Sequence, residues 1–212
     1  MLKILYYKSL ESTQIYLKEH IKNQTLKAPI AVVSDIQLNG IGSRDNKWQS
    51  KDGNLFLSFA IDINDLAEDL KLESASIYFS YLMKFTLEDF GSKVWLKWPN
   101  DLYIGDKKIG GMITTIVGNT LICGVGLNIL ISSDNYSKLD INISREILLK
   151  RYFKNIEKNI LWKQIFSKYK LQFEFNQKFF THINKEKVSL SEAVLEDDGS
   201  ITINGERIYS LR

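Results

Sequence analysis

The sequence lacks the features that mark several classes of protein. Its single cysteine, Cys123, cannot form an internal disulfide or a cysteine-rich metal site. No apolar run approaches the roughly 18 residues that cross a bilayer. The N-terminus, which begins Met1-Leu2-Lys3-Ile4-Leu5, has neither the apolar segment nor the small-residue cleavage site of a secretory signal. These absences predict a cytoplasmic protein without a membrane partner.

An excess of charge of one sign is also lacking. The 28 basic and 25 acidic side chains leave a net charge of +3, and the two signs are mixed along the chain, as in Lys185-Glu186-Lys187. Proteins that bind nucleic acids usually concentrate Lys and Arg on one face or helix. We therefore expect no nucleic-acid partner. A hydrophobic content of 44% is typical of a globular chain that buries a sizeable core.

The hydrophobic periodicity predicts a mixed core of helices and strands followed by a short β-rich tail. Helices are expected at about 13–23, 72–90, 144–153 and 158–180, and strands at 2–7, 29–34, 55–61, 94–98, 102–104, 108–117 and 120–130. In the tail, Asn204-Gly205 predicts a hairpin turn between strands at 201–203 and 208–211. The stretch 35–53 has almost no periodicity, and a loop of that length inside a compact domain is typically a binding loop.

Four segments contain residue types that are typical of ligand sites. They are Ser12-Thr13-Gln14 at a helix start, the glycine-containing stretch 37–48, Lys97-Trp98-Pro99-Asn100-Asp101-Leu102 with the following 107–111, and Gly124-Val125-Gly126-Leu127-Asn128. Each segment alone has an ordinary explanation, such as a helix cap, a turn or close packing. Their combination in one chain is harder to explain in that way.

In order and approximate spacing, the four segments resemble the catalytic domain of biotin–protein ligases over most of the chain. The hexapeptide from Lys97 to Leu102 is the most specific of them. The resemblance implies an α+β fold with a mixed, largely antiparallel sheet packed with helices. It also implies a catalytic domain at 1–182 and a trimmed C-terminal β appendage at 183–212. The DNA-binding domain that some members carry is expected to be absent, because only one strand is expected before Ser12.

The resemblance also implies a reaction and a partner. Such ligases use Mg²⁺ to join biotin to ATP as biotinyl-5′-AMP, and then transfer biotin to one lysine of a biotin carboxyl carrier protein, such as that of acetyl-CoA carboxylase. A monomer and a homodimer both remain open. So do two alternative functions, a lipoate or octanoate ligase or transferase on the same fold and a non-catalytic biotin-binding regulator.

Individual residues receive roles through the same resemblance. Lys108 matches the lysine that bridges the biotin carboxylate and the α-phosphate, and Asp101 matches a residue that contacts nucleotide and metal and helps to deprotonate the acceptor lysine. The catalytic residues expected are thus Lys108, Asp101 and Arg44, with Asp101 as the metal ligand. The residues expected to bind the substrates are Ser12, Thr13, Gln14, Gln37, Gly40, Ile41, Gly42, Ser43, Trp48, Lys97, Asn100, Lys108, Gly110, Gly111, Gly126 and Asn128.

The glycine loop departs from the family pattern. That pattern reads Gly-Arg-Gly-Arg, whereas this chain has Gly40-Ile41-Gly42-Ser43 and only Arg44 one place later. Neighbouring Cα atoms are about 3.8 Å apart, a distance that a long arginine side chain can cover. We therefore expect Arg44 to take over the contacts of the missing arginines.

Overall fold

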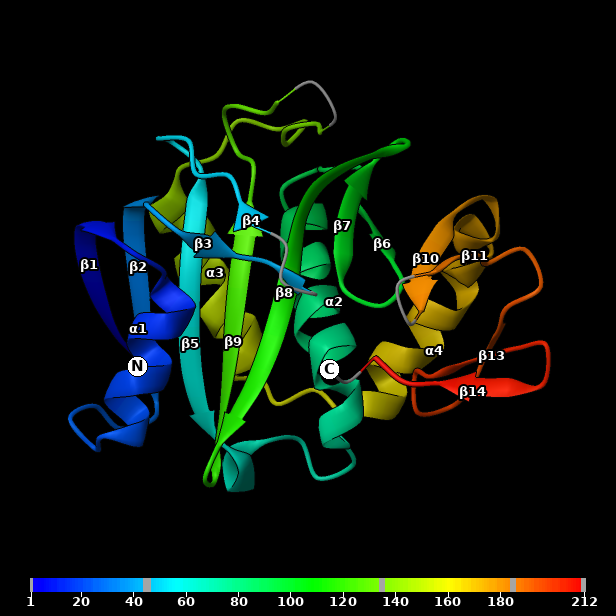
Figure 1. Cartoon of the computed structure of the whole chain (residues 1–212), viewed down its shortest axis with the longest axis horizontal. Helices are drawn as coiled ribbons and strands as arrows, with labels where there is room; N and C mark the ends of the chain where they lie inside the picture. Colours follow the sequence, from blue (N-terminus) through cyan, green and yellow to red (C-terminus); the bar gives the residue numbers. More distant parts are fainter. Residues whose placement is uncertain (1, 44–46, 134–135, 184–185, 211–212) are drawn as a thin grey trace.

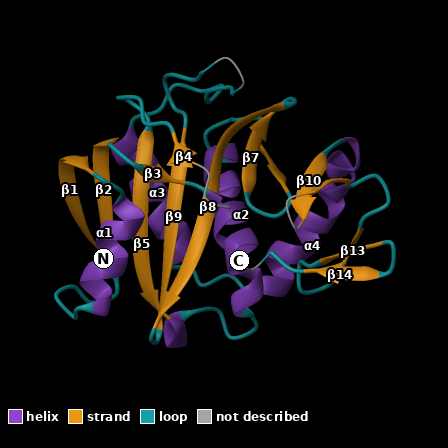
Figure 2. Cartoon of the chain, viewed as in Figure 1, coloured by secondary structure: helices purple, strands orange, loops and turns teal. Residues whose placement is uncertain are grey.

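The computed structural model describes residues 2–43, 47–133, 136–183 and 186–210. A seven-stranded sheet with the order β1-β2-β5-β9-β8-β7-β6 forms its centre (Figures 1 and 2). The strands are β1 (Lys3–Leu10), β2 (Ile30–Gln37), β5 (Leu55–Asp62), β9 (Thr120–Leu127), β8 (Lys107–Val117), β7 (Asp101–Ile104) and β6 (Trp95–Lys97). Only β1 and β2 pair in parallel in this sheet, so the expected α+β class with a largely antiparallel sheet is confirmed.

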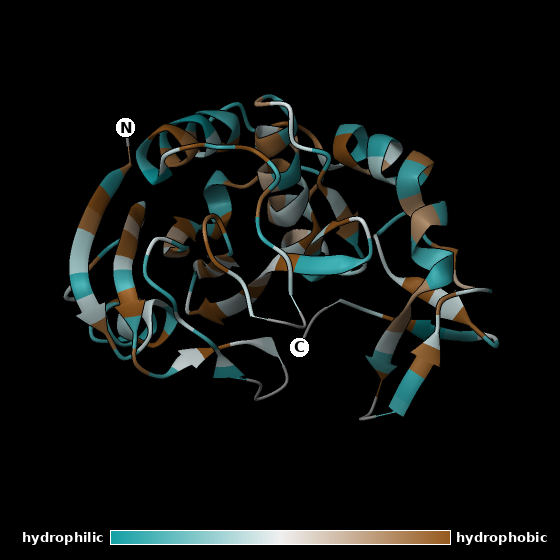
Figure 3. Cartoon of the chain, turned by 90° about the horizontal axis from the view of Figure 1, so that it is seen from above, coloured by the Kyte–Doolittle hydropathy of each residue, from teal (hydrophilic) through white to brown (hydrophobic). Residues whose placement is uncertain are grey.

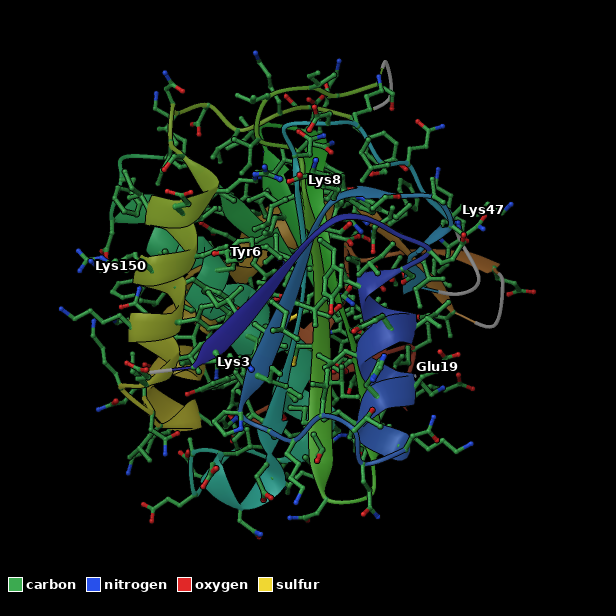
Figure 4. All side chains as sticks on the ribbon, turned by 90° about the vertical axis from the view of Figure 1, so that its left-hand side faces the viewer. Lys3, Tyr6, Lys8, Glu19, Lys47 and Lys150 are labelled. Atoms are coloured by element: carbon green, nitrogen blue, oxygen red, sulfur yellow. The ribbon has the colours of Figure 1, made fainter. Side chains whose placement is uncertain are left out.

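Helices cover both faces of the sheet. Helix α1 (Thr13–Lys22) lies on one face, and α3 (Arg145–Ile156) lies on the opposite face (Figure 4). Helix α2 (Ala75–Glu88) packs against β6, β7 and β8, and α3 and α4 (Trp162–Gln172) pack against α2. The sheet is therefore the middle layer of the molecule.

Each face of the seven-stranded sheet packs on its own hydrophobic cluster. Beneath α1 the cluster is small and includes Leu17, Val32 and Ile122. On the other face a larger cluster contains Phe59, whose ring meets Phe79 edge-to-face at 5.4 Å between centroids. Burial on both faces explains why β5 reads as a nearly continuous apolar run and not as an alternating strand.

The edge strand β1 differs from the buried strands beside it. Figure 3 shows hydrophilic and hydrophobic residues mixed along its ribbon, and Tyr6 on it is exposed. Lys3 and Lys8 lie along the same edge (Figure 4). Charged side chains of this kind protect the edge of a sheet from pairing with other chains.

Several element boundaries follow from contacts that are distant in sequence. The predicted helix at 158–180 begins only at Trp162, because the carboxylate of Asp69 accepts hydrogen bonds from the backbone N–H groups of Trp162 (2.6 Å) and Lys163 (3.0 Å). It gives way to the 3-10 helix η4 (Phe173–Lys178). The predicted helix at 72–90 is confirmed as a 3-10 turn, η3 (Leu72–Ser74), followed by α2.

The expectation that 35–53 has no regular structure was wrong at two places. Strand β2 continues to Gln37, and β3 (Gly40–Ile41) pairs with β4 (Lys47–Trp48) in a short ladder. Backbone hydrogen bonds within the segment and to residues at the end of β1 stabilise it, and such bonds leave no periodicity in the sequence. A further 3-10 helix, η2 (Ile63–Asp65), follows β5.

The C-terminal part forms two small sheets. Strand β10 (Phe180–Ile183) pairs with β11 (Glu186–Ser189), and β12 (Val194–Leu195), β13 (Ile201–Ile203) and β14 (Glu206–Ile208) form the other sheet. The predicted hairpin turn is confirmed, with positive φ angles of 52° at Asn204 and 80° at Gly205. The predicted domain boundary at 182/183 falls within β10 and stays a prediction.

The turn at 197–199 fastens this C-terminal part to the core. Its backbone carbonyls accept hydrogen bonds from the indole of Trp162 (2.8 Å), the hydroxyl of Ser74 (2.6 Å) and the indole of Trp98 (2.8 Å). Both indoles are buried. In the described part of the chain, no helix combines the length and the hydropathy that a membrane crossing requires.

Candidate active site

A cleft is lined by residues at the start of α1, in the β3–β4 ladder and in strands β5, β8 and β9. Figure 1 shows where these elements lie. The empty volume between the lining residues is about 440 Å³, including space that is open to solvent. Most of the predicted substrate-binding residues line it, together with the two described catalytic candidates: Ser12, Thr13, Gln14, Gln37, Ile41, Gly42, Ser43, Trp48, Asp101, Lys108, Gly111 and Gly126. The fold thus brings all or part of each of the four sequence segments to one place.

One end of the cleft is a buried network of uncharged polar groups. The side-chain oxygen Oε1 of Gln37 accepts hydrogen bonds from the backbone N–H (2.8 Å) and the hydroxyl (3.1 Å) of Thr13. The Thr13 and Ser58 hydroxyls are 2.9 Å apart, and the Ser58 hydroxyl donates to Oε1 of Gln14 at 3.0 Å. These hydrogen bonds fix the orientation of each donor and acceptor.

Ser12 has a different role from its neighbours in the described structure. Its hydroxyl oxygen caps α1 by accepting a hydrogen bond from the backbone N–H of Ile15 at 3.4 Å. The cap sets where the helix begins and therefore where Thr13 and Gln14 enter the cleft.

Sequence reasoning missed Ser58. It lies in the middle of β5, is fully buried, and completes the network between Thr13 and Gln14. A polar residue in the centre of the apolar run Leu55–Ile61 was the available signal, because a buried hydroxyl needs a hydrogen-bonding partner.

Two glycines on β9 leave room for the side chains of Gln14 and Trp48 at the cleft. A Cβ atom at Gly124 would lie 2.6 Å from Oε1 of Gln14, and one at Gly126 would lie 2.5 Å from the ring of Trp48. Any larger residue would displace these two side chains. Gly124 was part of the recognised motif but was not among the predicted site residues.

The other end of the cleft carries charge. The carboxylate of Asp101 is 2.6 Å from the ammonium of Lys108 and 3.9 Å from that of Lys97. An irregularity in the β7–β8 ladder between Leu102 and Tyr103 pairs Tyr103 with Lys108. Burial, reinforced by the negative charge of Asp101, raises the pKa of the nearby Tyr103.

The Trp48 ring lies between the two ends. The ammonium of Lys108 is 5.9 Å from its centroid, within the range of a cation–π contact. Its indole N–H is buried and has no hydrogen-bond partner among the described residues. It is therefore a donor that a bound ligand could satisfy.

Several predicted residues lie beside the cleft. Lys97 and Asn100 line a smaller cavity, and Asn128 lines a neighbouring one with Asn54 and Tyr136. Gly40 borders an outer depression behind Trp48, and Gly110 allows close packing of β8 against β9. Arg44 lies outside the described residues, so its predicted role stays a prediction.

Asn54 organises the segment after Asn128 and was also missed. Its side-chain oxygen accepts hydrogen bonds from three consecutive backbone N–H groups at 129–131, and its amide donates to the carbonyl of Ile131 at 2.8 Å. It is 1% exposed. An asparagine just after a glycine turn gives no sequence signal of such a long-range role.

This arrangement suits a ligand with a neutral polar head and an anionic tail. The network of Thr13, Gln37, Ser58 and Gln14 can exchange hydrogen bonds with an uncharged ring. Lys108 can stabilise negative charge at the other end. A group of three or more His, Cys, Asp or Glu residues that could hold a metal ion does not occur in the described ranges.

The chain matches the family model described as "Biotin/lipoate A/B protein ligase family" over residues 6–130, more than half of its length. It is 32% identical over 126 residues to the bifunctional ligase/repressor BirA of Escherichia coli, a match that spans 56% of this chain and 38% of that protein. It is 36% identical over 105 residues to biotin–protein ligase 2 of Arabidopsis thaliana, covering 46% of this chain and 32% of that protein. The matches thus span about a third of these relatives.

Solved structures match over nearly the whole chain. The biotin acetyl coenzyme A carboxylase synthetase of Helicobacter pylori, solved with bound biotinylated ATP, is 40% identical with a TM-score of 0.95, covering 99% of this chain and 100% of that one. The biotin protein ligase of Aquifex aeolicus, solved with biotin and ATP, is 22% identical with a TM-score of 0.80. The match covers 100% of this chain and 97% of that one. The second likeness bears on the fold alone.

Proposed function

The chain belongs to the biotin/lipoate A/B protein ligase family, and on that premise we propose that it is an ATP-dependent biotin–protein ligase. It forms biotinyl-5′-AMP from biotin and ATP, and it then transfers the biotinyl group to a lysine of a biotin carboxyl carrier protein. The similar H. pylori protein, whose structure holds biotinylated ATP, supports biotin and ATP as the substrates.

The observation that carries this proposal is the contrast between the two ends of the cleft. The bicyclic head of biotin contains a urea group, which is uncharged and both donates and accepts hydrogen bonds. The buried amides and hydroxyls of Gln37, Thr13, Gln14 and Ser58 provide neutral partners for it. The biotin carboxylate then extends toward the ammonium of Lys108.

The lipoate alternative fits this cleft less well. The ring of lipoate contains two sulfur atoms and no urea, so it cannot exchange strong hydrogen bonds with the network around Ser58. Burying such a network against an apolar ring costs about 1–3 kcal/mol for each group left without a partner. The chemistry of the cleft therefore favours biotin.

In the first step, a biotin carboxylate oxygen attacks the α-phosphorus of ATP. Both reactants are anions, and Lys108 offsets their repulsion and the charge that develops in the transition state. Because Lys108 already contacts Asp101 at 2.6 Å, its ammonium is oriented before the substrates arrive. Arg44, outside the described residues, is proposed to hold the phosphate from the glycine loop.

In the second step, Asp101 accepts a proton from the attacking lysine of the carrier. A free lysine has a pKa of about 10.4 and is almost entirely charged and non-nucleophilic at neutral pH. Asp101 is the only carboxylate among the described lining residues of the cleft, which makes it the best-placed base. The mixed anhydride hydrolyses readily, so the loop carrying Trp48 is proposed to exclude water from it.

Asp101 also fits a site for Mg²⁺. This ion keeps several waters and is usually held in such enzymes by one or two carboxylates together with the substrate phosphates. The Asn100 amide nitrogen donates a hydrogen bond to the carbonyl of Met112. Asp101 is the residue that we propose as the protein ligand. Bound there, Mg²⁺ would neutralise charge on the phosphates.

The carrier's identity, the choice between monomer and homodimer, and the cytoplasmic location stay predictions.

The decisive experiment is incubation with biotin, ATP, Mg²⁺ and an isolated carrier domain, followed by mass measurement of the carrier. We expect a mass increase of one biotinyl group that requires both small substrates. Lipoate in place of biotin is the matched control for the first alternative. Pyrophosphate release in the absence of carrier tests the second, because a non-catalytic regulator releases none.

A further inference from the structure

Asp101 follows a three-residue loop at the edge of the seven-stranded sheet. The loop joins β6 to β7, and the ladder between these strands pairs Lys97 with Asp101. Strand β6 is the last strand of this sheet in the described part of the chain. Buried backbone groups of β6 and its loop that do not bond to β7 therefore need partners from elsewhere in the fold.

The side chain of Asn176 on η4 provides one such partner. Its Oδ1 accepts a hydrogen bond from the backbone N–H of Trp98, the first residue of the loop, at 2.7 Å. Both residues are completely buried. The Nδ2 of Asn176 is buried too and has no hydrogen-bond partner among the described residues. Of the two polar atoms of this side chain, the oxygen is thus the one with a described partner.

Aromatic packing fixes Asn176 against the edge of the sheet. The ring centroid of Trp95 on β6 lies 6.2 Å from that of Phe175 and 5.1 Å from that of Phe179, which flank Asn176 in the sequence. The Phe179 ring also meets Tyr103 on β7 at 5.5 Å. Because η4 packs on both strands of the hairpin, the place of the Asn176 oxygen is set before any substrate binds.

The other end of the loop is attached to β8. The backbone carbonyl of Asn100 accepts a hydrogen bond from the backbone N–H of Met112 at 3.0 Å, and the Asn100 amide donates to the Met112 carbonyl. The loop is therefore held at its first residue by Asn176 and at its last residue by β8. Asp101 follows directly after the second attachment.

The carboxylate of Asp101 is held by less rigid contacts than its backbone. It is paired with the ammonium of Lys108 at 2.6 Å and with that of Lys97 at 3.9 Å. A lysine ammonium stands on a flexible four-carbon stem, so it follows a carboxylate more than it fixes one. The place of the carboxylate therefore depends on the loop that leads into β7.

We infer that Asn176 is a positioning residue for Asp101 in the transfer step. The inference rests on the proposed function. In that step Asp101 takes a proton from the acceptor lysine, whose nitrogen forms a bond to the carbonyl carbon of biotinyl-5′-AMP. The bond from that carbon to the phosphate oxygen breaks, and AMP leaves with the electron pair. A base must lie within roughly 2.6–3.2 Å of the group that it deprotonates, so a shift of the loop slows this step.

A double-mutant cycle tests the inference. Asn176→Leu keeps the branched shape of the side chain but removes the acceptor, and single-turnover mass measurement gives the rate of transfer from pre-formed biotinyl-5′-AMP to a carrier domain. A displacement of about 1 Å can cost about 100-fold in rate, so we expect a loss of roughly tenfold or more. The KM for biotin should not change. In the Asp101→Asn background the same substitution should cause no further loss, because Asn176 acts through Asp101.

Ser74→Ala is the matched control for stability. It removes another buried hydrogen bond between distant segments, from the Ser74 hydroxyl to the carbonyl of Asp198 at 2.6 Å. We expect both Ser74→Ala and Asn176→Leu to lower the melting temperature, and only the second to slow transfer. If Asn176→Leu does not fold, Asn176→Ala takes its place in the cycle, since it leaves room for a water beside the Trp98 N–H.

Two outcomes overturn the inference. Normal transfer in an Asn176 variant that melts at a lower temperature would leave this residue a structural role alone. Equal losses with Asp101 and with Asn at that position would show that Asn176 acts independently of the carboxylate. Failure of the proposed function has a different signature, which is a wild-type protein that forms no biotinyl-5′-AMP and labels no carrier.

Discussion

The two ends of the cleft are built on different principles. At the neutral end, Thr13, Gln14, Gln37 and Ser58 are buried and bonded to one another, so their geometry is set before a ligand arrives. At the charged end, the side chains of Asp101 and Lys108 are about a fifth and a quarter exposed (21% and 24%) and hold each other by a single ion pair. The neutral end is suited to recognition, whereas the charged end can exchange partners and is suited to chemistry.

The largest effect should come from removing the charge of Asp101. Asp101→Asn keeps the shape of the side chain, but it cannot accept a proton from the acceptor lysine. General bases typically contribute 10²- to 10⁴-fold, so we expect at least a roughly 100-fold loss in the rate of transfer to the carrier. Single-turnover mass measurement from pre-formed biotinyl-5′-AMP gives that rate. Normal transfer in a normally melting variant would leave Asp101 only a structural role in its turn.

Lys108→Ala should have the next largest effect and should act on the first step. Losing one charge-assisted contact costs about 1.5–3 kcal/mol, or roughly 10- to 150-fold in rate. Rapid-quench measurement of adenylate formation tests this expectation. Lys107→Ala is the matched control, because Lys107 is adjacent and exposed but does not line the cleft. Equal rates in the two variants would contradict the assignment.

At the neutral end, Ser58→Ala should affect binding more than chemistry. The change leaves the Thr13 hydroxyl and Oε1 of Gln14 without one buried partner, at a cost of about 1–3 kcal/mol. We expect a lower melting temperature and an increase of about fivefold or more in the KM for biotin, with kcat nearly unchanged. A fall in kcat with an unchanged KM would mean that the two ends are not separate in function.

Local patterns in the sequence predicted much of the fold. The apolar run of β5 and the Asn204-Gly205 turn depend on near neighbours, and each occurs in the structure as expected. The cap of α1 is also a local feature, and Ser12 provides it. The start of α4 at Trp162 was misplaced because its capping carboxylate, Asp69, is 93 residues away. Local signals carry no information about such a partner.

The candidate site also contains residues that local motifs predict and residues whose role depends on distant contacts. Its motifs identified most of the cleft lining, because their residue types resemble those of a known family. Ser58 and Asn54 were missed, since each acts through hydrogen bonds to segments more than 40 residues away. The contact between Asn176 and Trp98 likewise needed the three-dimensional structure.

The smallest expected effect concerns a charged group away from the cleft, in the C-terminal turn. Burial raises the pKa of Asp198, but hydrogen bonds from the hydroxyl and backbone N–H of Ser200 and from the guanidinium of Arg207 outweigh it and lower that pKa below its ordinary value of 3.8. A carboxylate with a lowered folded-state pKa stabilises the fold above its unfolded pKa, and this contribution is lost as the pH falls through the folded value.

Asp198→Asn should therefore lower the melting temperature by a few degrees at pH 7, and the difference from the wild type should shrink steadily below about pH 4. Thermal melts across pH 2–7 measure it. Asp197→Asn is the neighbouring control, because Asp197 precedes Asp198 in the same turn. The biotinylation rate at pH 7 should be close to that of the wild type, because Asp198 touches neither the cleft nor the smaller cavity. A difference in melting that persists at pH 2 would show that Asp198 stabilises the turn through its shape, and the link between charge and stability would then fail.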